Sequence, residues 1–394
     1  MNDLKIIKLK PYGEKRALSG HPWIFSNELE KPDKDIEPGS ICRIVSSSNL
    51  PVGTGFFNPH SLISIRLLAN GTKNLEPDFV QRRISQAIAA RHELGIAESG
   101  RMFYGESDGI GGLIIDKYAG IVVVEMLSAG AEKLKIEIVK TIMEKLAPEA
   151  VFLKNSHEFR KLENLELYEE TAFGKVPDTA LITENGIKYE VPVKSGQKTG
   201  HFFDQRENRA FLAPYFKSRK VLDLYCYTGS FALTAAGAGA KTVWGVDSSR
   251  NALDFAVRNA ALNNLADKVI FKKEDAEKIL KAMLADELPE KPDFALLDPP
   301  NFVRSKKNIS QARRLYIKLN AFAIGALPPD GYLATSSCSR HISREDFVNI
   351  LSAAAAQARR KAILVELRGQ AKDHPILLNM PETEYLHFAL LRVL

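Results

Sequence analysis

Short apolar runs alternate with longer helical segments in the C-terminal part of the chain. Apolar runs at 221–224, 242–246, 268–271 and 294–297 predict strands, with helical segments between the first three and before the fourth. A run at 333–335 predicts a fifth strand. This alternation indicates a parallel sheet with helices on both faces, and ligands of such sheets bind beyond the carboxyl ends of the strands.

The first 70 or so residues show a different pattern, in which apolar and polar positions alternate over short stretches. Residues 40–45 and 61–67 predict strands, and the segments 37–39 and 51–55 supply turns. A small β-rich domain is the natural interpretation. Its opening segment carries a basic edge near aromatic residues, which suits RNA phosphates and bases, but a solvated edge with a core tryptophan explains the pattern equally well. These residues are Lys5, Lys8, Lys10, Lys15, Arg16, His21, Trp23 and Phe25.

The middle of the chain predicts a small α+β domain. A helix is expected over 78–94, a hairpin from the runs 113–115 and 121–124, a buried helix face over 134–146, and a strand at 151–153. Nothing in this stretch points to catalysis, so it is interpreted as a spacer or an RNA-facing platform. The chain then divides into a β-rich domain at 1–72, a central α+β linking domain at 73–188 and an α/β domain at 189–394.

Composition and charge narrow the class of protein only slightly. The 394 residues are 45% hydrophobic and 26% charged, as in ordinary folded proteins, and the net charge of +6 mildly favours a polyanionic partner. No apolar run approaches the roughly 20 residues of a membrane helix, and the start lacks a signal-peptide pattern, so a cytoplasmic protein without membrane contact is expected. The three cysteines are far apart, which suggests neither a metal site nor disulfides.

Candidate cofactor residues follow the first three predicted strands of the α/β domain. The segment 223–231 leaves the first strand and opens a helix, and it has one glycine, Gly229, where a dinucleotide loop would need three. This favours an adenosyl cofactor without phosphates, and the acidic Asp223 suits the cationic part of S-adenosylmethionine. Asp247 ends the second strand and can accept hydrogen bonds from ribose hydroxyls, with helix capping as the alternative. Asp275 follows the third strand, where it can meet the adenine amino group.

Candidate reacting groups follow the fourth and fifth strands. The fourth strand ends in Asp298-Pro299-Pro300-Asn301-Phe302, a rigid turn that can hold a carboxylate against a flat base. The fifth leads into Cys338, which lies at the same edge of the sheet. Carbon 5 of a pyrimidine becomes nucleophilic only when a thiolate adds to carbon 6, whereas amino-group methylation needs no thiol. Cys338 therefore favours carbon-5 methylation, and the neighbouring Arg340 or His341 can help hold the thiolate. Cys42 and Cys226 are interpreted as buried small hydrophobes.

The motifs together resemble the ribosomal RNA large-subunit 5-methylcytosine methyltransferases that carry an N-terminal PUA domain. The resemblance covers nearly the full chain through the segments 21–25, 197–206, 227–229, 298–302, 337–339 and 373–375. It implies a PUA-like domain, a central linking domain and a Rossmann-like class I methyltransferase domain, often in a homodimer. It also implies that Lys198 to Arg206 forms a lid over the cofactor, that Cys338 is the nucleophile and that Asp298 bonds the cytosine edge.

The residues expected at the site fall into three groups. Cys338 and Asp298 are expected to be catalytic. Contacts with S-adenosylmethionine are expected from Lys198, Thr199, Gly200, Phe202, Asp204, Arg206, Asp223, Tyr225, Tyr227, Thr228, Gly229, Asp247, Asp275 and Asp298. Contacts with the substrate base are expected from Pro299, Pro300 and Phe302.

The expected function is formation of 5-methylcytosine in 23S ribosomal RNA through a covalent cysteine adduct at carbon 6. Two alternatives stay open at this point. One is a uridine carbon-5 RNA methyltransferase, which would use the same thiol and differ in how the base edge is recognised. The other is a non-catalytic RNA-binding factor of ribosome assembly whose cofactor pocket is silent. The base that removes the carbon-5 proton is unassigned.

Overall fold

The chain folds into two compact units. A computed structural model describes residues 4–32, 35–288, 290–303 and 308–394. Unit 1 comprises Met1–Ile182, Val191–Phe203 and Lys372–Thr383, and unit 2 comprises Thr183–Glu190, Asp204–Ala371 and Glu384–Leu394. The first two predicted domains thus lie in one unit up to Ile182, with their last residues in unit 2, and two segments of the predicted third domain group with unit 1.

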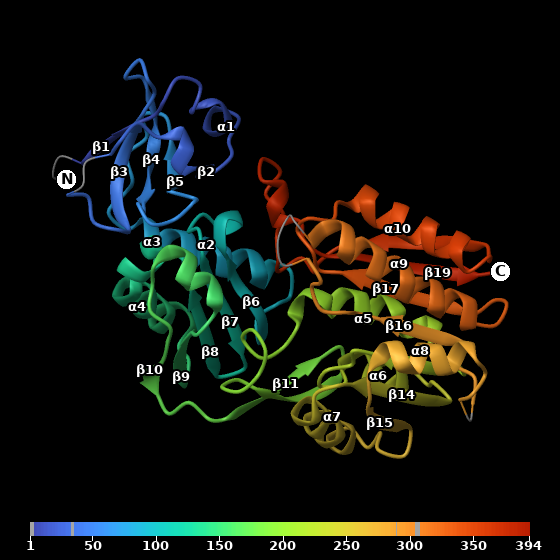
Figure 1. Ribbon diagram of the computed structural model, residues 1–394. Helices are drawn as coiled ribbons and strands as arrows, with labels where there is room; N and C mark the ends of the chain where they lie inside the picture. The colour runs from blue at the N-terminus through green and yellow to red at the C-terminus, as the bar shows by residue number, and fades with distance from the viewer. Residues whose placement is uncertain (1–3, 33–34, 289, 304–307) are drawn as a thin grey trace. The chain divides into compact units, whose positions relative to one another are not determined.

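Unit 1 opens with a five-stranded sheet of order β1-β3-β4-β5-β2 (Figure 1). β1 pairs with β3 in parallel, and the other pairs are antiparallel. The strand predicted at 61–67 begins only at Ile65, as β5. The Asn58 N–H donates to the Ser64 carbonyl (2.9 Å), so the residues between Asn58 and Ser64 form a loop. The strands are β1 (Ile6–Lys8), β2 (Trp23–Ile24), β3 (Ser40–Val45), β4 (Pro51–Phe57) and β5 (Ile65–Asn70), with a short helix α1 (Lys15–Leu18).

A second five-stranded sheet, of order β10-β9-β8-β7-β6, forms the rest of unit 1. Apolar residues of the helices α2 and α4 join those of the strands in one core, as the amphipathic pattern predicted. The expected hairpin is present as an antiparallel pair, β7 and β8. The elements are α2 (Phe79–Glu93), β6 (Ser99–Tyr104), β7 (Leu113–Tyr118), β8 (Ile121–Met126), α3 (Ala129–Lys133), α4 (Lys135–Leu146), β9 (Ala150–Asn155) and β10 (Tyr168–Gly174).

A two-stranded hairpin, β11 (Thr179–Glu184) with β12 (Ile187–Pro192), precedes the large sheet of unit 2. That sheet has seven strands in the order β15-β14-β13-β16-β17-β19-β18, and the first five are parallel. β19 runs antiparallel between β17 and β18. The strands are β13 (Lys220–Leu224), β14 (Thr242–Asp247), β15 (Val269–Lys273), β16 (Phe294–Leu297), β17 (Tyr332–Ser337), β18 (Ala362–Arg368) and β19 (His387–Val393).

Helices cover both faces of this sheet, as the alternating pattern predicted. α8, α9 and α10 pack on one another in one layer, and α5, α6 and α7 form the other (Figure 1). Leu222, Leu297 and Leu333 lie in one core with apolar residues of the α8, α9 and α10 layer. The helices are α5 (Arg206–Leu212), α6 (Ser230–Gly237), α7 (Arg250–Leu262), α8 (Ala276–Leu284), α9 (Ile309–Ala326) and α10 (Arg344–Gln357). No helix within the described residues has the length and apolar character needed to span a membrane.

Candidate cofactor and active site

The strand order of unit 2 places a switch point between β13 and β16. From β13 the chain proceeds outward through β14 and β15, and then returns to add β16 and β17 on the other side. The connections on the two sides of such a point diverge, which opens a crevice at the carboxyl ends of the strands. Asp223, near the end of β13, pairs in register with Leu296 of β16, two residues before Asp298. The predicted cofactor loop and the predicted Asp-Pro-Pro turn therefore leave the sheet side by side.

The loop between β13 and α6 has an unusual backbone. Tyr225, Tyr227 and Gly229 have φ values of 64°, 50° and 84°, in the left-handed region. Two hydrogen bonds hold the loop against β14. The Cys226 N–H donates to the Val246 carbonyl (3.0 Å), and the Tyr227 N–H donates to Asp247 Oδ2 (3.0 Å). A side chain at Gly229 would meet Phe271, since its Cβ would lie 3.0 Å from the ring. Tight turns of this kind bring backbone close to a ligand.

A buried carboxylate lies beneath this loop. Asp223 is 1% exposed, and its Oδ2 accepts from the Ala232 N–H at 2.9 Å. Burial raises the pKa of Asp223 well above its usual range; the Ala232 hydrogen bond lowers it, and the charges of Asp298 and Asp247 raise it further. Within the described residues, the buried Oδ1 has no hydrogen-bond partner. A group with these surroundings is stabilised by a ligand that brings donors and positive charge, as the methionine part of S-adenosylmethionine does.

Asp247 and Asp275 also lie where parallel strands end, at the ends of β14 and β15, and each accepts hydrogen bonds from nearby backbone N–H groups. Asp247 accepts from the Tyr227 and Ser249 N–H groups, which orients it beside the loop. Asp275 is exposed and caps α8, where it accepts from the Lys278 N–H at 3.0 Å. Burial raises the pKa of Tyr225 to about 12, and the Asp275 charge contributes to that rise. Their predicted contacts with ribose and adenine remain predictions.

The reacting end is built from the ends of β16 and β17. Asp298 Oδ1 accepts from the Ser336 hydroxyl and from Gln205 Nε2 (3.2 Å). Cys338 follows Ser336 by two residues and is partly exposed. Burial raises the pKa of Tyr316, and the charges of Cys338 and Asp298 raise it further. The two predicted catalytic residues thus follow the ends of neighbouring strands and both influence the pKa of one buried tyrosine.

The turn after Asp298 contributes surfaces of different character. Pro299 is buried, Pro300 is exposed, and Phe302 is partly buried. The Phe302 ring packs against Tyr316 with the ring centroids 5.0 Å apart. Residues 304–307 lie outside the described residues. A flat base would meet an apolar, rigid edge here, and the substrate contacts assigned to this turn remain a prediction.

The other two cysteines differ from Cys338 in burial. Burial raises the pKa of Cys42 to about 11 and also raises that of Cys226. A thiol must ionise to act as a nucleophile, so both are poor candidates. The structure thus agrees with their interpretation as small core residues.

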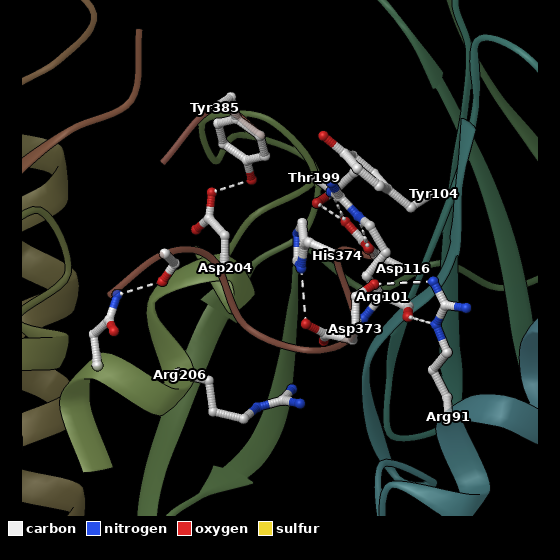
Figure 2. A network of polar contacts seen from close by, with 12 residues as sticks. Arg91, Arg101, Tyr104, Asp116, Thr199, Asp204, Arg206, Asp373, His374 and Tyr385 are labelled. Atoms are coloured by element: carbon white, nitrogen blue, oxygen red, sulfur yellow. Dashed lines mark hydrogen bonds and ion pairs between the residues drawn. The ribbon is translucent and has the colours of Figure 1, made fainter. Parts of the chain in front are cut away.

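The predicted lid, Lys198 to Arg206, is divided between the two units after Phe203. In unit 1 the Thr199 hydroxyl donates to Asp116 and accepts from the Tyr118 hydroxyl (2.9 Å), while Arg101 donates twice to Asp116 at 2.8 Å (Figure 2). Thr199 therefore has structural partners, and its contact with a cofactor remains a prediction.

The remaining lid residues have similarly local surroundings. Lys198 Nζ lies 4.5 Å from the centroid of the Phe202 ring, and Gly200 has a φ of 133°. In unit 2 the Asp204 carboxylate accepts from the Tyr385 hydroxyl at 2.6 Å (Figure 2). Arg206 Nε lies 3.5 Å from the Glu184 carboxylate. A cofactor contact is a prediction for each of these residues too.

Three residues near the reacting end were not singled out from the sequence. Gln205 lies in the segment 197–206 that carries the family resemblance but had no expected role of its own, and neither Ser336 nor Tyr316 was an expected site residue. Gln205 and Ser336 approach Asp298 from 93 and 38 residues away along the chain. The sequence signal for Ser336 is its place among the serines that flank Cys338, whereas nothing in the pattern of α9 marks Tyr316.

Comparisons with known proteins agree with this geometry. A family model described as a PUA-like domain matches residues 7–70, and one described as an S-adenosylmethionine-dependent methyltransferase matches residues 112–357. Two curated relatives carry the name ribosomal RNA large subunit methyltransferase I. The one from Pseudoalteromonas atlantica is 37% identical and the one from Shewanella frigidimarina 38% identical, each over 98% of this chain and 99% of the relative.

Solved structures confirm the predicted fold. A candidate SAM-dependent methyltransferase from Streptococcus mutans superimposes with a TM-score of 0.84 at 20% identity, covering 99% of this chain and all of that one. A second candidate methyltransferase, solved in complex with SAH, gives the same TM-score over 98% of this chain and 99% of its own. The family model and the relatives together show that the chain belongs to the S-adenosylmethionine-dependent methyltransferases, and that S-adenosylmethionine is its cofactor.

Proposed function

We propose that this enzyme methylates carbon 5 of a cytosine in the 23S RNA of the large ribosomal subunit, with Cys338 as the nucleophile. The single observation that carries the chemistry is the position of Cys338, a partly exposed thiol at the end of β17, two residues after the hydroxyl that binds Asp298. The substrate class is supported by the relatives, whose name assigns them to large-subunit ribosomal RNA. The PUA-like match at residues 7–70 and the net charge of +6 agree with an RNA substrate.

The proposed reaction begins when the target cytidine is turned out of its stack, at a cost of a few kcal/mol. The Cys338 thiolate forms a bond to carbon 6, and the electron pair displaced from the ring double bond makes carbon 5 nucleophilic. When bound, S-adenosylmethionine would supply an electrophilic methyl group to carbon 5, and cleavage of its methyl–sulfur bond would leave S-adenosylhomocysteine. Loss of the carbon-5 proton restores the double bond and releases the Cys338 sulfur from carbon 6.

The chain's own residues have distinct proposed roles. Asp298 accepts a hydrogen bond from the base edge, while Pro299, Pro300 and Phe302 form the surface against the ring. Asp223 and Asp247 hold the methionine and ribose parts of the cofactor, and Asp275 its adenine. The loop residues Tyr225, Tyr227, Thr228 and Gly229 and the lid residues Lys198, Thr199, Gly200, Phe202, Asp204 and Arg206 complete the proposed cofactor contacts.

The proposal includes the arrangement of the chain at a larger scale. It keeps the division into a PUA-like domain at 1–72, a central linking domain at 73–188 and a methyltransferase domain at 189–394. It also keeps a cytoplasmic location and a homodimer. Sedimentation of the purified protein tests the oligomeric state, because a monomer at micromolar concentration would contradict the dimer.

The decisive experiment is methyl transfer to unmodified ribosomal RNA from labelled S-adenosylmethionine, followed by digestion to nucleosides. We expect labelled 5-methylcytidine from the wild type, none from Cys338→Ala, and an undiminished yield from the matched control Cys42→Ala, whose sulfur lies in the core of the first sheet. Labelled 5-methyluridine would instead support the uridine alternative. Full transfer by Cys338→Ala would rule out the covalent mechanism.

Calorimetry separates the enzyme from the non-catalytic assembly factor. The buried, partly unsatisfied Asp223 predicts measurable affinity for S-adenosylmethionine. RNA binding without cofactor binding would favour the assembly factor, although membership of the methyltransferase family favours an enzyme.

A further inference from the structure

A chain of buried and partly buried hydrogen bonds in unit 2 ends on the carboxylate of Asp298. Arg368 Nε donates to Asn208 Oδ1 at 3.1 Å, Asn208 Nδ2 donates to Gln205 Oε1 at 2.7 Å, and Gln205 Nε2 donates to Asp298 Oδ1 at 3.2 Å. The Ser336 hydroxyl donates to the same oxygen from β17. Residues from α5, the 3-10 turn before it, β17 and β18 thus act together on one carboxylate, which directly follows β16.

The direction of this chain is fixed by its first member. A guanidinium can only donate, so the group of Asn208 that faces Arg368 must be the carbonyl oxygen. The Asn208 amide N–H then faces Gln205, which must present its own carbonyl oxygen there. This turns the Gln205 N–H toward Asp298. The arrangement therefore presents donors to Asp298 and suits an ionised carboxylate, which only accepts.

Burial makes these contacts energetically significant. Gln205 is 2% exposed, Asn208 1% and Ser336 1%. Asp298 itself is partly exposed, but its two donors come from buried side chains, and hydrogen bonds to charged groups are stronger than those between neutral groups. A carboxylate held by two buried donors keeps one orientation.

Orientation matters because the bases differ in what they offer an acceptor. Cytosine presents an exocyclic amino donor at carbon 4, where uracil presents a carbonyl acceptor. A fixed carboxylate that accepts from the amino group also repels the uracil carbonyl, and such repulsion is an effective source of specificity.

We propose that Gln205 and Ser336 are positioning residues that hold Asp298 as an acceptor for the cytosine amino group, and that they thereby set the preference for cytosine over uracil. The inference rests on the function proposed above. Because Ser336 lies two residues before Cys338 on the same strand end, one element fixes both the base-reading carboxylate and the nucleophile.

The test compares Ser336→Ala with the matched control Thr335→Val. Thr335 is the preceding residue of β17, is equally buried, and its hydroxyl has no hydrogen-bond partner within the described residues. Each enzyme is assayed on two RNAs that differ only in cytosine or uracil at the target position. Nucleoside analysis measures 5-methylcytidine and 5-methyluridine, and calorimetry measures the Kd for S-adenosylmethionine.

We expect kcat/KM on the cytosine RNA to fall about ten- to a hundredfold in Ser336→Ala, the effect of losing one hydrogen bond to a charged group. The ratio of 5-methylcytidine to 5-methyluridine formation should fall about tenfold, while the Kd for S-adenosylmethionine stays within about twofold. Thr335→Val should match the wild type in all three. A merely structural role for Ser336 would lower both activities in parallel and leave the ratio unchanged.

A second variant, Gln205→Met, keeps the proposal testable if Ser336→Ala does not fold. It removes the donor to Asp298 at similar volume, and Asn208 keeps its hydrogen bond to the Gly369 carbonyl (3.1 Å). The same loss of ratio is expected. If the wild type is active and both variants keep its ratio of 5-methylcytidine to 5-methyluridine, this inference is overturned while the proposed function stands. A wild type that forms no 5-methylcytidine would overturn the proposed function and the inference together.

Discussion

Two buried carboxyl groups of the chain, Asp223 and Glu125, have raised pKa values for the same main reason, burial, but in different surroundings. The neighbours that influence Asp223 are mostly other carboxylates. Arg209 offsets them only in part, because its guanidinium is bound to Glu184 at 2.6 and 2.9 Å. Charge at Asp223 is therefore best compensated by a bound cation, which is why this residue carries the argument for the cofactor site.

Glu125 of β8 gives a pH-dependent stability prediction. Burial raises its pKa to about 7; Arg101 lowers it, Asp116 raises it, and Lys154 and Lys198 lower it. Between about pH 4.5 and 7 the folded state keeps a proton that the unfolded state releases, so stability falls as the pH rises through this window.

The free energy of unfolding of Glu125→Gln, measured relative to that of the wild type, should therefore rise by about 1–3 kcal/mol from pH 5 to pH 8. Urea unfolding at the two pH values measures the difference, and Glu93→Gln, at the end of α2, serves as an exposed control. An equal difference between variant and wild type at both pH values would contradict the prediction.

The loop between β13 and α6 provides a prediction at the scale of an element. Gly229→Ala places a Cβ 3.0 Å from Phe271 in a backbone with φ of 84°, whereas Gly239→Ala meets nothing within 4 Å at a φ of 90°. Both variants should lose about 1 kcal/mol of stability through backbone strain, with a further loss at Gly229. Only Gly229→Ala should weaken the binding of S-adenosylmethionine, by about tenfold or more. Calorimetric titration checks this, and equal affinities in the two variants would show that the loop does not contact the cofactor.

The elements that the sequence predicted well are those with a strong local pattern. Four of the parallel strands of unit 2, β13, β14, β16 and β17, are mostly buried and contain apolar runs, whereas β15 at the edge of the sheet is largely exposed; all five were anticipated. In contrast, β10 is largely exposed and charged, so its sequence carries little sign of a strand. The segment 61–67 alternates as a strand would, yet part of it forms a loop closed by Asn58 and Ser64.

The candidate site shows the same division between local and distant information. The loop at Gly229, the Asp-Pro-Pro turn and Cys338 follow strands directly, so the sequence could locate them. The hydrogen bonds of Asp298 could not be inferred, because their donors depend on tertiary packing. Trp23 was equally open to an RNA contact or a core position; it is 9% exposed and donates to Glu106 at 2.7 Å, which favours the core.

At the scale of the whole molecule, the chain passes between the two units several times, and pattern alone did not reveal this. The segment Lys372–Thr383 belongs to unit 1, where Asp373 Oδ2 accepts from the Arg101 N–H and its carbonyl accepts from Arg91, each at 3.0 Å. His374 packs on Tyr104 with ring centroids 5.4 Å apart (Figure 2). A short segment is thus fixed to a unit far from it in sequence by a few buried polar contacts.

Within unit 1, Arg66 joins the two sheets. It lies in β5 of the first sheet and donates to Glu106 at 2.6 Å and to Glu163 at 3.1 Å, both of which belong to the second part of the unit. All three side chains are largely buried. Removing the cation from such a cluster leaves two carboxylates without their compensating charge, which typically costs about 3–5 kcal/mol.

Arg66→Met should therefore destabilise unit 1 without acting on the proposed cofactor residues of unit 2, with which Arg66 has no described contact. Hydrogen exchange should accelerate throughout β3–β5 and β6–β9, and remain at the wild-type rate in β13–β17, since exchange reports local and subglobal opening. Arg43→Met is the matched control, because Arg43 lies in the same sheet and its side chain donates to the exposed Asn74. Faster exchange in both units to the same extent would mean that the molecule unfolds as one cooperative body, and that the two units share a single stability.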